Sequence, residues 1–131
     1  MPSENGEPSQ SLRVLVVEDN PINQKVMVGF LEFLGHSATV IDDGAKALEA
    51  INADSFDVAM IDIQLPGLSG TDLVIKVRET GTDLPFLIAV TAHARSDGTI
   101  HYRKRGFDAY LGKPVTISDV SNVLESLQPL R

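Results

Sequence analysis

Residues 58–70 read VAMIDIQLPGLSG, and they contain the clearest strand signal in the chain. Four apolar residues, 58–61, lead directly into an acid, Asp62, and a loop with Pro66 and Gly67 follows. An unbroken apolar run of this length is typical of a strand that is covered on both faces, as in a parallel sheet. A carboxylate beside such a strand costs free energy unless something pairs with it. The stretch therefore predicts a buried strand that presents Asp62 at its end.

Other short apolar runs alternate with helical periodicity on both sides of this stretch. The expected strands are Arg13–Val17, Ser37–Ile41, Asp57–Ile61, Phe86–Val90 and Asp108–Leu111. The expected helices run from Pro21 to Gly35, Gly44 to Asn52, Thr71 to Glu79, Ser96 to Arg105 and Ile117 to Leu127. Five strand–helix units in succession predict an α/β fold with a parallel sheet and helices on both faces.

The composition of the strands also predicts their order in the sheet. The first, third and fourth strands are unbroken apolar runs, whereas the second and fifth are shorter or more polar. Strands with both faces covered belong in the centre, so the second and fifth are expected at the edges. The resulting order, 2-1-3-4-5, is that of the flavodoxin-like, doubly wound (βα)5 fold, in which ligands bind beyond the carboxyl ends of the strands.

The expected helices carry apolar stripes that predict their buried faces. The first helix begins at Pro21 behind Asn20, a residue type that caps helix N-termini. Its expected stripe consists of the apolar residues Ile22, Val26, Phe30, Phe33 and Leu34. The stripes of the second, third and last helices are Ala47, Leu48 and Ile51; Leu73, Val74 and Val77; and Ile117, Val120, Val123, Leu124 and Leu127.

Length and composition exclude several classes of function. The chain has 131 residues, which fits one domain at residues 12–131 behind a polar tail or linker at 1–11. It has no cysteine, which excludes disulfides and thiolate metal sites and suits a cytoplasmic location. A net charge of −7 argues against direct binding to nucleic acid or anionic lipid, and no apolar run is long enough to cross a membrane.

Polar residues follow the central strands at the edge where ligands are expected. Glu18 and Asp19 follow the first strand, Asp62 the third, Thr91 the fourth and Lys113 the fifth. Crowded carboxylates stay ionised only beside a cation, and hard oxygen ligands without His or Cys suit Mg²⁺. A metal ion, an ammonium group and a hydroxyl facing Asp62 would form a site for a tetrahedral anion on that carboxylate. Because aspartate can act as a nucleophile toward phosphorus, Asp62 is the expected phosphoacceptor.

Four motifs in this order, VVEDNPINQ, MIDIQLPGLSG, AVTAHA and DAYLGKP, resemble the receiver domains of two-component response regulators. The resemblance covers Leu12 to about Leu127. The segments DNPINQ and IDIQLPG are most similar to the corresponding segments in receivers of hybrid sensor histidine kinases. It implies a phosphorelay in which a histidine kinase or a histidine phosphotransfer domain donates the phosphoryl group to Asp62. The domain would catalyse its own phosphorylation and dephosphorylation.

The resemblance also implies roles for individual residues. Glu18, through water, Asp19, Asp62 and the backbone carbonyl of Gln64 would hold Mg²⁺. Thr91 and Lys113 would contact phosphate oxygens, and Tyr110 would turn inward as a switch when Thr91 moves. The Lys113–Pro114 peptide bond would be cis, which X-Pro bonds permit.

Other functions remain as alternatives. A Mg²⁺-dependent phosphatase would need an acid two residues after the nucleophile, where this chain has Gln64. A flavin or nucleotide binder would need a Gly-rich loop after the first strand, which here reads EDNP. A receiver-like docking module that is never phosphorylated would not need the complete set of acids, Thr91 and Lys113.

Several features are open from the sequence alone. His93 reads as a solvated loop residue that could also control the access of water to the phosphoryl group. The basic run at residues 101–106, HYRKRG, is either a solvated helix face or a docking surface for a partner. The chain is either part of a hybrid kinase, as the cytoplasmic part of a membrane-bound sensor, or a single-domain regulator. Its oligomeric state is open.

Overall fold

A computed structural model describes residues 11–80, 84–92 and 106–127 of the chain. The tail at 1–10, the fourth expected helix at 96–105, His93 and residues 101–105 of the basic run lie outside the described residues. The strands are β1 (Arg13–Val17), β2 (Ser37–Ile41), β3 (Val58–Asp62), β4 (Phe86–Thr91) and β5 (Ala109–Gly112). The helices are α1 (Pro21–Phe33), α2 (Gly44–Ala53), α3 (Gly70–Thr80) and α5 (Ile117–Glu125).

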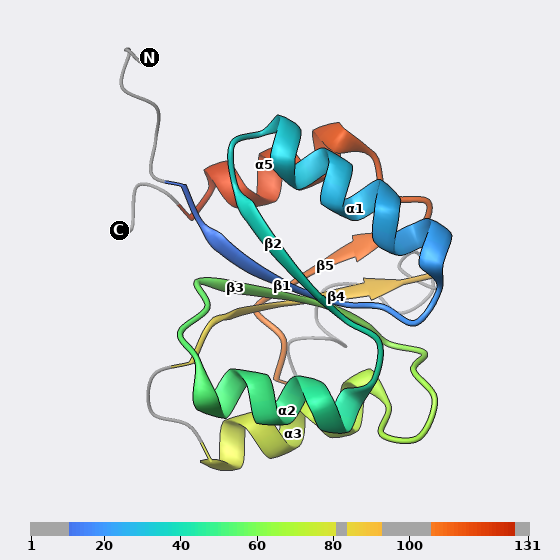
Figure 1. Cartoon of the computed structure of the whole chain (residues 1–131), viewed down its shortest axis with the longest axis vertical. Helices are drawn as coiled ribbons and strands as arrows, with labels where there is room; N and C mark the ends of the chain where they lie inside the picture. Colours follow the sequence, from blue (N-terminus) through green and yellow to red (C-terminus); the bar gives the residue numbers. More distant parts are fainter. Residues whose placement is uncertain (1–10, 81–83, 93–105, 128–131) are drawn as a thin grey trace.

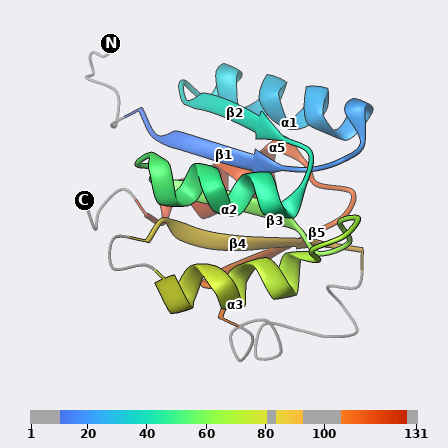
Figure 2. The same ribbon diagram turned by 60° about the horizontal axis from the view of Figure 1, so that its bottom comes forward.

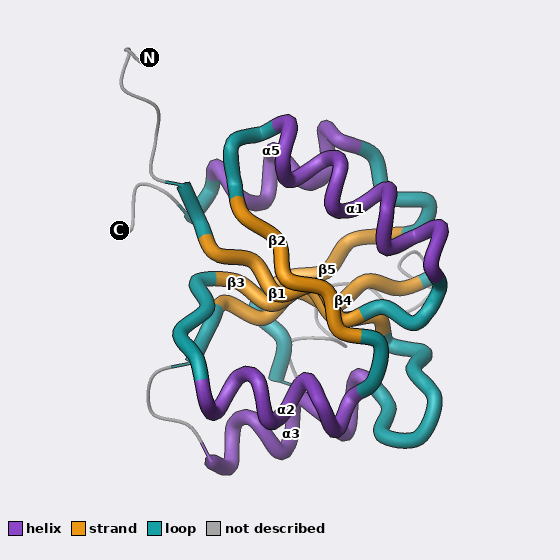
Figure 3. The backbone as a smooth tube through the Cα atoms, in the orientation of Figure 1, coloured by secondary structure: helices purple, strands orange, loops and turns teal. Residues whose placement is uncertain are grey.

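The five strands form one parallel sheet in the order β2-β1-β3-β4-β5, which confirms the predicted flavodoxin-like topology. Helices α1 and α5 cover one face, and α2 and α3 cover the other (Figure 1). The view turned by 60° shows α2 and α3 lying across the same face of the strands (Figure 2). Because all strands run in one direction, their carboxyl ends meet at one edge of the sheet (Figure 3).

The side chains of alternate residues on the central strands pack into two hydrophobic cores, one on each face of the sheet. On β1, Leu15 and Val17 face α2 and α3, whereas Val14 and Val16 face α1 and α5. All five residues of β3 are buried, whereas β2 at one edge has none that is fully buried. This burial pattern confirms the central and edge positions that strand composition predicted.

The third and fifth strands begin and end one residue later than predicted, and the fourth ends one residue later, so that β3 and β4 end at polar residues. Asp62 is the last residue of β3 and pairs with Val90 rather than following the strand. Thr91 likewise ends β4, where it pairs with Gly112 of β5. Backbone pairing between neighbouring strands therefore extends to these two residues. Their side chains project from strand backbone and not from a loop.

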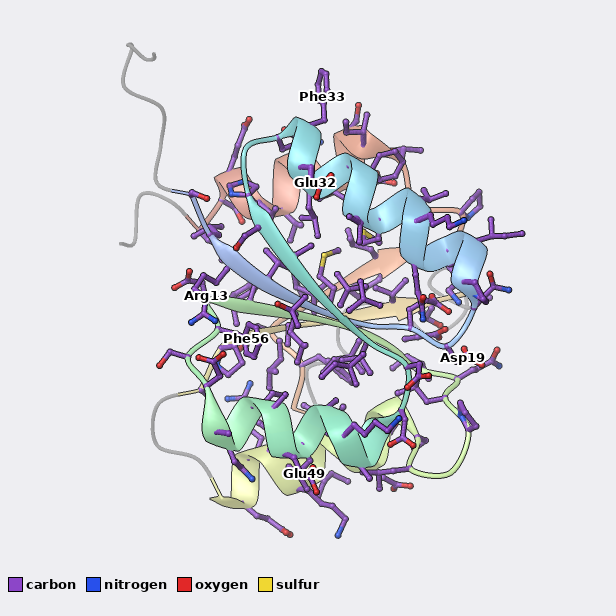
Figure 4. The ribbon with its side chains drawn as sticks, in the orientation of Figure 1. Arg13, Asp19, Glu32, Phe33, Glu49 and Phe56 are labelled. Atoms are coloured by element: carbon purple, nitrogen blue, oxygen red, sulfur yellow. The ribbon has the colours of Figure 1, made fainter. Side chains whose placement is uncertain are left out.

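The predicted buried stripe of α1 is wrong in part. The side chains of Met27 and Leu31 are buried, with Phe30 and Leu34 packed partly against the same core. Ile22, Val26 and Phe33 are instead exposed, at 72%, 45% and 82%. Figure 4 shows the ring of Phe33 pointing away from the molecule. Because α1 is apolar around much of its circumference, periodicity could not select the face that meets the sheet.

The other buried faces agree with their predicted stripes, although some helix ends differ. Leu73, Val74 and Val77 of α3 are fully buried. Helix α1 ends at Phe33, and Gly35 at φ 92° follows in the left-handed conformation that glycine favours at helix ends. Helix α5 ends at Glu125, two residues before the predicted end at Leu127. No described helix is long and apolar enough to cross a membrane.

Candidate functional site

Three acids come together at the carboxyl edge of the sheet. Carboxylate oxygens of Glu18, Asp19 and Asp62 lie within 4.8 Å of one another. Asp62 is the end of β3, and Glu18 and Asp19 follow β1, the strand beside it. Figure 4 labels Asp19 at the edge of the molecule where the strands end. The parallel sheet therefore brings together side chains that are separated by more than forty residues in the sequence.

Lys113 adds the opposing charge to this cluster. Its Nζ donates to Oδ2 of Asp62 at 2.9 Å and lies 3.9 Å from Oε1 of Glu18. Asp62 is 4% exposed, so this ammonium group neutralises a carboxylate that is almost out of water. The other oxygen of Asp62, Oδ1, accepts the backbone N–H of Gln64 at 2.9 Å. Both oxygens of the buried carboxylate are thus paired, as burial requires.

Lys113 is held in place by the backbone as well as by its side chain. Its N–H donates to the carbonyl oxygen of Thr91 at 2.8 Å. The Lys113–Pro114 peptide bond is cis, as the resemblance implied. The ends of β4 and β5 therefore carry Thr91 and Lys113 side by side, and Thr91 is 2% exposed.

Glu18 occupies a different environment from Asp19. Glu18 is 7% exposed, whereas Asp19 is exposed. The N–H of Asn20 donates to Oε2 of Glu18 at 3.1 Å. Burial raises the pKa of Glu18, the charge of Asp62 raises it further, and the hydrogen bond from Asn20 opposes both effects. A carboxylate in this state is stabilised by any cation that reaches it.

The helix start behind these acids has the predicted cap. Oδ1 of Asn20 accepts the N–H groups of Ile22 at 2.9 Å and Asn23 at 3.1 Å. The side chain of Gln24 also donates to the carbonyl oxygen of Glu18 at 2.6 Å. Asn20 therefore has two roles. Its side chain caps α1, as predicted, and its backbone N–H donates to the carboxylate of Glu18, which was not predicted.

One residue that sequence reasoning missed lies directly behind Asp62. A Cβ built on Gly70 would collide with the backbone carbonyl oxygen of Asp62 and lie 2.9 Å from Cα of Ile63. The N–H of Gly70 donates to the carbonyl oxygen of Ile63 at 3.1 Å. Only glycine allows the start of α3 to approach the end of β3 this closely. The glycine at the end of the LPGLSG loop was the available signal.

Of the remaining predicted site residues, Gln64 contacts the cluster through its backbone N–H, and Tyr110 lies on β5. Gln64 follows Asp62 by two residues, in the loop between β3 and α3. Tyr110 is partly buried on β5 and packs against the core on the α2 and α3 face. His93 lies outside the described residues.

Residues 14–125 match the response regulator receiver domain family. The chain is 36% identical to sensor histidine kinase GacS of Pseudomonas protegens over 121 residues, which are 88% of this chain and 13% of that protein. It is 35% identical to aerobic respiration control sensor protein ArcB of Escherichia coli over 120 residues, 90% of this chain and 15% of that protein. The chain thus spans a small part of the length of these curated relatives.

One solved structure is similar to this chain over nearly the whole length of both. It is the receiver domain of sensor histidine kinase PA1611 from Pseudomonas aeruginosa, with a magnesium ion coordinated in the active site cleft. The two share 29% sequence identity and a TM-score of 0.80, over 89% of this chain and 97% of the other.

Proposed function

Because the chain belongs to the response regulator receiver domain family of two-component systems, we propose that Asp62 accepts a phosphoryl group from a phosphohistidine. The observation that carries this proposal is the state of Asp62 itself. Its carboxylate is 4% exposed, lies in an acidic cluster and is paired with Lys113 at 2.9 Å. The contact with Lys113 fixes the orientation of the carboxylate, which a nucleophile requires.

The acids around Asp62 fit a magnesium ion. They offer oxygen donors alone, within 4.8 Å of one another, and Mg²⁺ prefers oxygen ligands and one or two carboxylates. Asp19 and Asp62 would bind it directly, Glu18 through water, and the carbonyl oxygen of Gln64 would complete the set. When bound, the ion would neutralise charge on the phosphoryl oxygens.

The residues of the chain would then guide the transfer. A carboxylate oxygen of Asp62 forms the new O–P bond while the N–P bond of the phosphohistidine breaks and its electron pair returns to the imidazole nitrogen. The ammonium of Lys113, already 2.9 Å from Asp62, contacts a phosphoryl oxygen, and the Thr91 hydroxyl donates to another. The switch is the movement of Thr91 toward the phosphoryl group, followed by an inward turn of Tyr110.

The phosphoryl donor is a histidine kinase or a histidine phosphotransfer domain. The similarity to GacS and ArcB, both sensor proteins of greater length, supports a place within a hybrid sensor kinase. A single-domain regulator is the other arrangement. In both, residues 12–131 act as the receiver domain in the cytoplasm, behind a linker at 1–11.

The donor would dock on the exposed apolar side chains of α1. Ile22, Val26 and Phe33 lie at intervals of four and seven residues, which aligns them along one side of the helix. Helix α1 starts three residues after Glu18, so this surface adjoins the acidic site. Gly29 lies between Val26 and Phe33 and has open space around it. An apolar helix face of the donor could pack along this stripe and bring its histidine to Asp62.

Two phosphoryl donors test this proposal. With Mg²⁺, both acetyl phosphate and a phosphorylated histidine phosphotransfer domain should phosphorylate the wild type, and neither should phosphorylate Asp62→Asn. Ile22→Ser should slow transfer from the protein donor by about tenfold and leave the reaction with acetyl phosphate unchanged. Ile75→Ser on α3, where Ile75 is 47% exposed, is the matched control. An equal effect of both serine variants would contradict docking on α1.

A further inference from the structure

A cavity of about 440 Å³ opens beside the acidic cluster, between α1 and the ends of the central strands. Pockets for small organic ligands in proteins have volumes of roughly 300–1,000 Å³, and their walls are mostly apolar. The apolar walls of this cavity come from the strands and from α1: Val16, Met60, Val90, Val26 and Met27. Pro114 and Val115, from the segment that follows Lys113, also line it.

The polar end of the cavity is formed by Glu18, Asp62, Lys113 and Asn23. The ammonium group of Lys113 donates a hydrogen bond to Asp62 at 2.9 Å. Its distance from Oε1 of Glu18, 3.9 Å, is too long for a hydrogen bond. Glu18 lines the cavity and is 7% exposed, and its ammonium partner Lys113 lies a full ångström farther from it than from Asp62, so its Oε1 has no hydrogen bond from that ammonium.

The charges at this end favour a cation. Glu18 and Asp62, the two carboxylates that line this end, share one ammonium group among the described residues, that of Lys113, and a carboxylate oxygen of Asp19 lies within 4.8 Å of theirs. An inorganic ion would satisfy the carboxylates but would leave the apolar walls unfilled. A molecule that combines a positive charge with an apolar body would satisfy both parts, because burial of apolar surface and a charge-assisted hydrogen bond each contribute to binding.

We propose that this cavity binds small organic cations, with the ammonium group at Glu18 and the apolar body between α1 and the sheet. Because Glu18 and Asp62 also belong to the proposed magnesium site, such a ligand excludes the metal ion and suppresses phosphorylation of Asp62. This regulatory consequence rests on the proposed function. Binding of the cation itself does not, since it needs neither a metal ion nor a phosphoryl donor.

The probe is 2-phenylethylammonium, with 2-phenylethanol as its neutral analogue. Both are titrated into the ¹⁵N-labelled chain in magnesium-free buffer, and backbone amide shifts are recorded. The ammonium should give saturable shifts at residues that line the cavity, with a Kd on the order of 1 mM, as expected for a ligand of this size. The alcohol should bind at least about tenfold more weakly, because it cannot pair with Glu18. Equal binding of the two, or shifts away from the cavity, would overturn the proposal.

Variants locate the bound molecule. Val26→Phe fills the cavity from α1 at a half-exposed position, and Ile75→Phe is the matched control on α3, since the two residues are 45% and 47% exposed. Saturable binding should be lost in the first variant and kept in the second. Glu18→Gln should reduce binding of the ammonium to that of the alcohol. Unchanged binding in Val26→Phe or Glu18→Gln would contradict the assigned position.

Added magnesium separates this inference from the proposed function. It should raise the apparent Kd of the ammonium and leave that of the alcohol unchanged, because only the ammonium needs Glu18. Simultaneous binding of both cations would contradict the position at Glu18. If Asp62 failed to accept a phosphoryl group while the ammonium still bound in the cavity, the proposed function would fail and this inference would stand.

Discussion

The Nζ atom of Lys113 lies 2.9 Å from Oδ2 of Asp62, although the two residues are 51 positions apart in the chain. The contact joins the end of β3 to the residue after β5, with β4 between these strands. The side chain of Asp62 is 5% exposed and that of Lys113 is 28% exposed. The ammonium group therefore neutralises the carboxylate and still reaches solvent, where an incoming phosphoryl group would meet it.

Replacement of Lys113 tests whether this contact serves the reaction. Lys113→Met should lower the rate of phosphorylation by about 100-fold, the typical cost of removing one group that stabilises transition-state charge. The rate is measured with acetyl phosphate and Mg²⁺. Lys46→Met is the control, because Lys46 forms a pair with Asp42 in which the two side chains are 67% and 59% exposed. Equal rates in the two variants would contradict a role for Lys113.

Magnesium should stabilise the wild type against unfolding. A ligand at tenfold its Kd adds about 1.4 kcal/mol to the free energy of unfolding if it binds the folded state alone. Removal of the ion with a chelator should reverse this gain. Asp62→Asn should be more stable than the wild type without metal, because it relieves repulsion among the acids, and should gain little from Mg²⁺.

Thermal unfolding with Mg²⁺ and with chelator checks this prediction. Glu49→Gln is the control for loss of one negative charge, since Glu49 is labelled on α2 in Figure 4 and is exposed. A wild type that gains no stability from Mg²⁺ would argue against a metal site at the three acids.

Gly70 should be essential for the geometry of Asp62. In Gly70→Ala the new Cβ would collide with the backbone carbonyl oxygen of Asp62. We expect a loss of about 1–3 kcal/mol in the free energy of unfolding, the typical cost of overpacking, and slower phosphorylation. Gly29→Ala should instead stabilise the protein by about 0.5–1 kcal/mol, because Gly29 is helical with no atom within 4 Å of a built Cβ. Denaturant unfolding measures both, and destabilisation of equal size in the two variants would contradict the account.

His36 should make stability depend on pH. Its Nδ1 accepts the N–H of Leu12 at 3.0 Å, and burial lowers the pKa of the imidazole below its usual 6.5. Because the unfolded chain takes up the proton first, stability should be complete above about pH 6.5 and fall as the pH drops toward the lower pKa of the folded state.

Denaturant unfolding in metal-free buffer at about pH 7.5 and about pH 5.5 checks this window. His36→Asn keeps a hydrogen-bond acceptor that does not titrate, so the fall in stability between the two pH values should be smaller than in the wild type. An equal fall in both proteins would exclude His36 as the cause.

Much of the fold could be predicted because the strands carry strong local signals. β1 and β2 have the predicted ends, and the strand order follows from which runs are wholly apolar. The convergence of Glu18, Asp62 and Lys113 followed from the parallel topology. The sequence could not supply distances, so the structure was needed to show that Lys113 donates to Asp62 at 2.9 Å and lies farther from Glu18, at 3.9 Å.

The buried face of α1 and the role of Gly70 could not be predicted for a shared reason. Both depend on where another element lies. Met27 and Leu31 are buried because the path from β1 turns that side of the helix toward the sheet. Gly70 matters because α3 begins against the backbone of Asp62. Local periodicity and turn composition contain neither relationship.

Locating the phosphoryl group on the chain tests directly whether Asp62 is the phosphoacceptor. The chain is incubated with Mg²⁺ and a phosphorylated histidine phosphotransfer domain, reduced with borohydride to trap any acyl phosphate, digested and analysed by mass spectrometry. We expect one reduced aspartate, Asp62, in the peptide that contains VAMIDIQLPGLSG. Asp62→Asn should give no trapped product. Modification at Asp19 or Glu18 in the wild type, or undiminished phosphorylation of Asp62→Asn, would contradict this assignment.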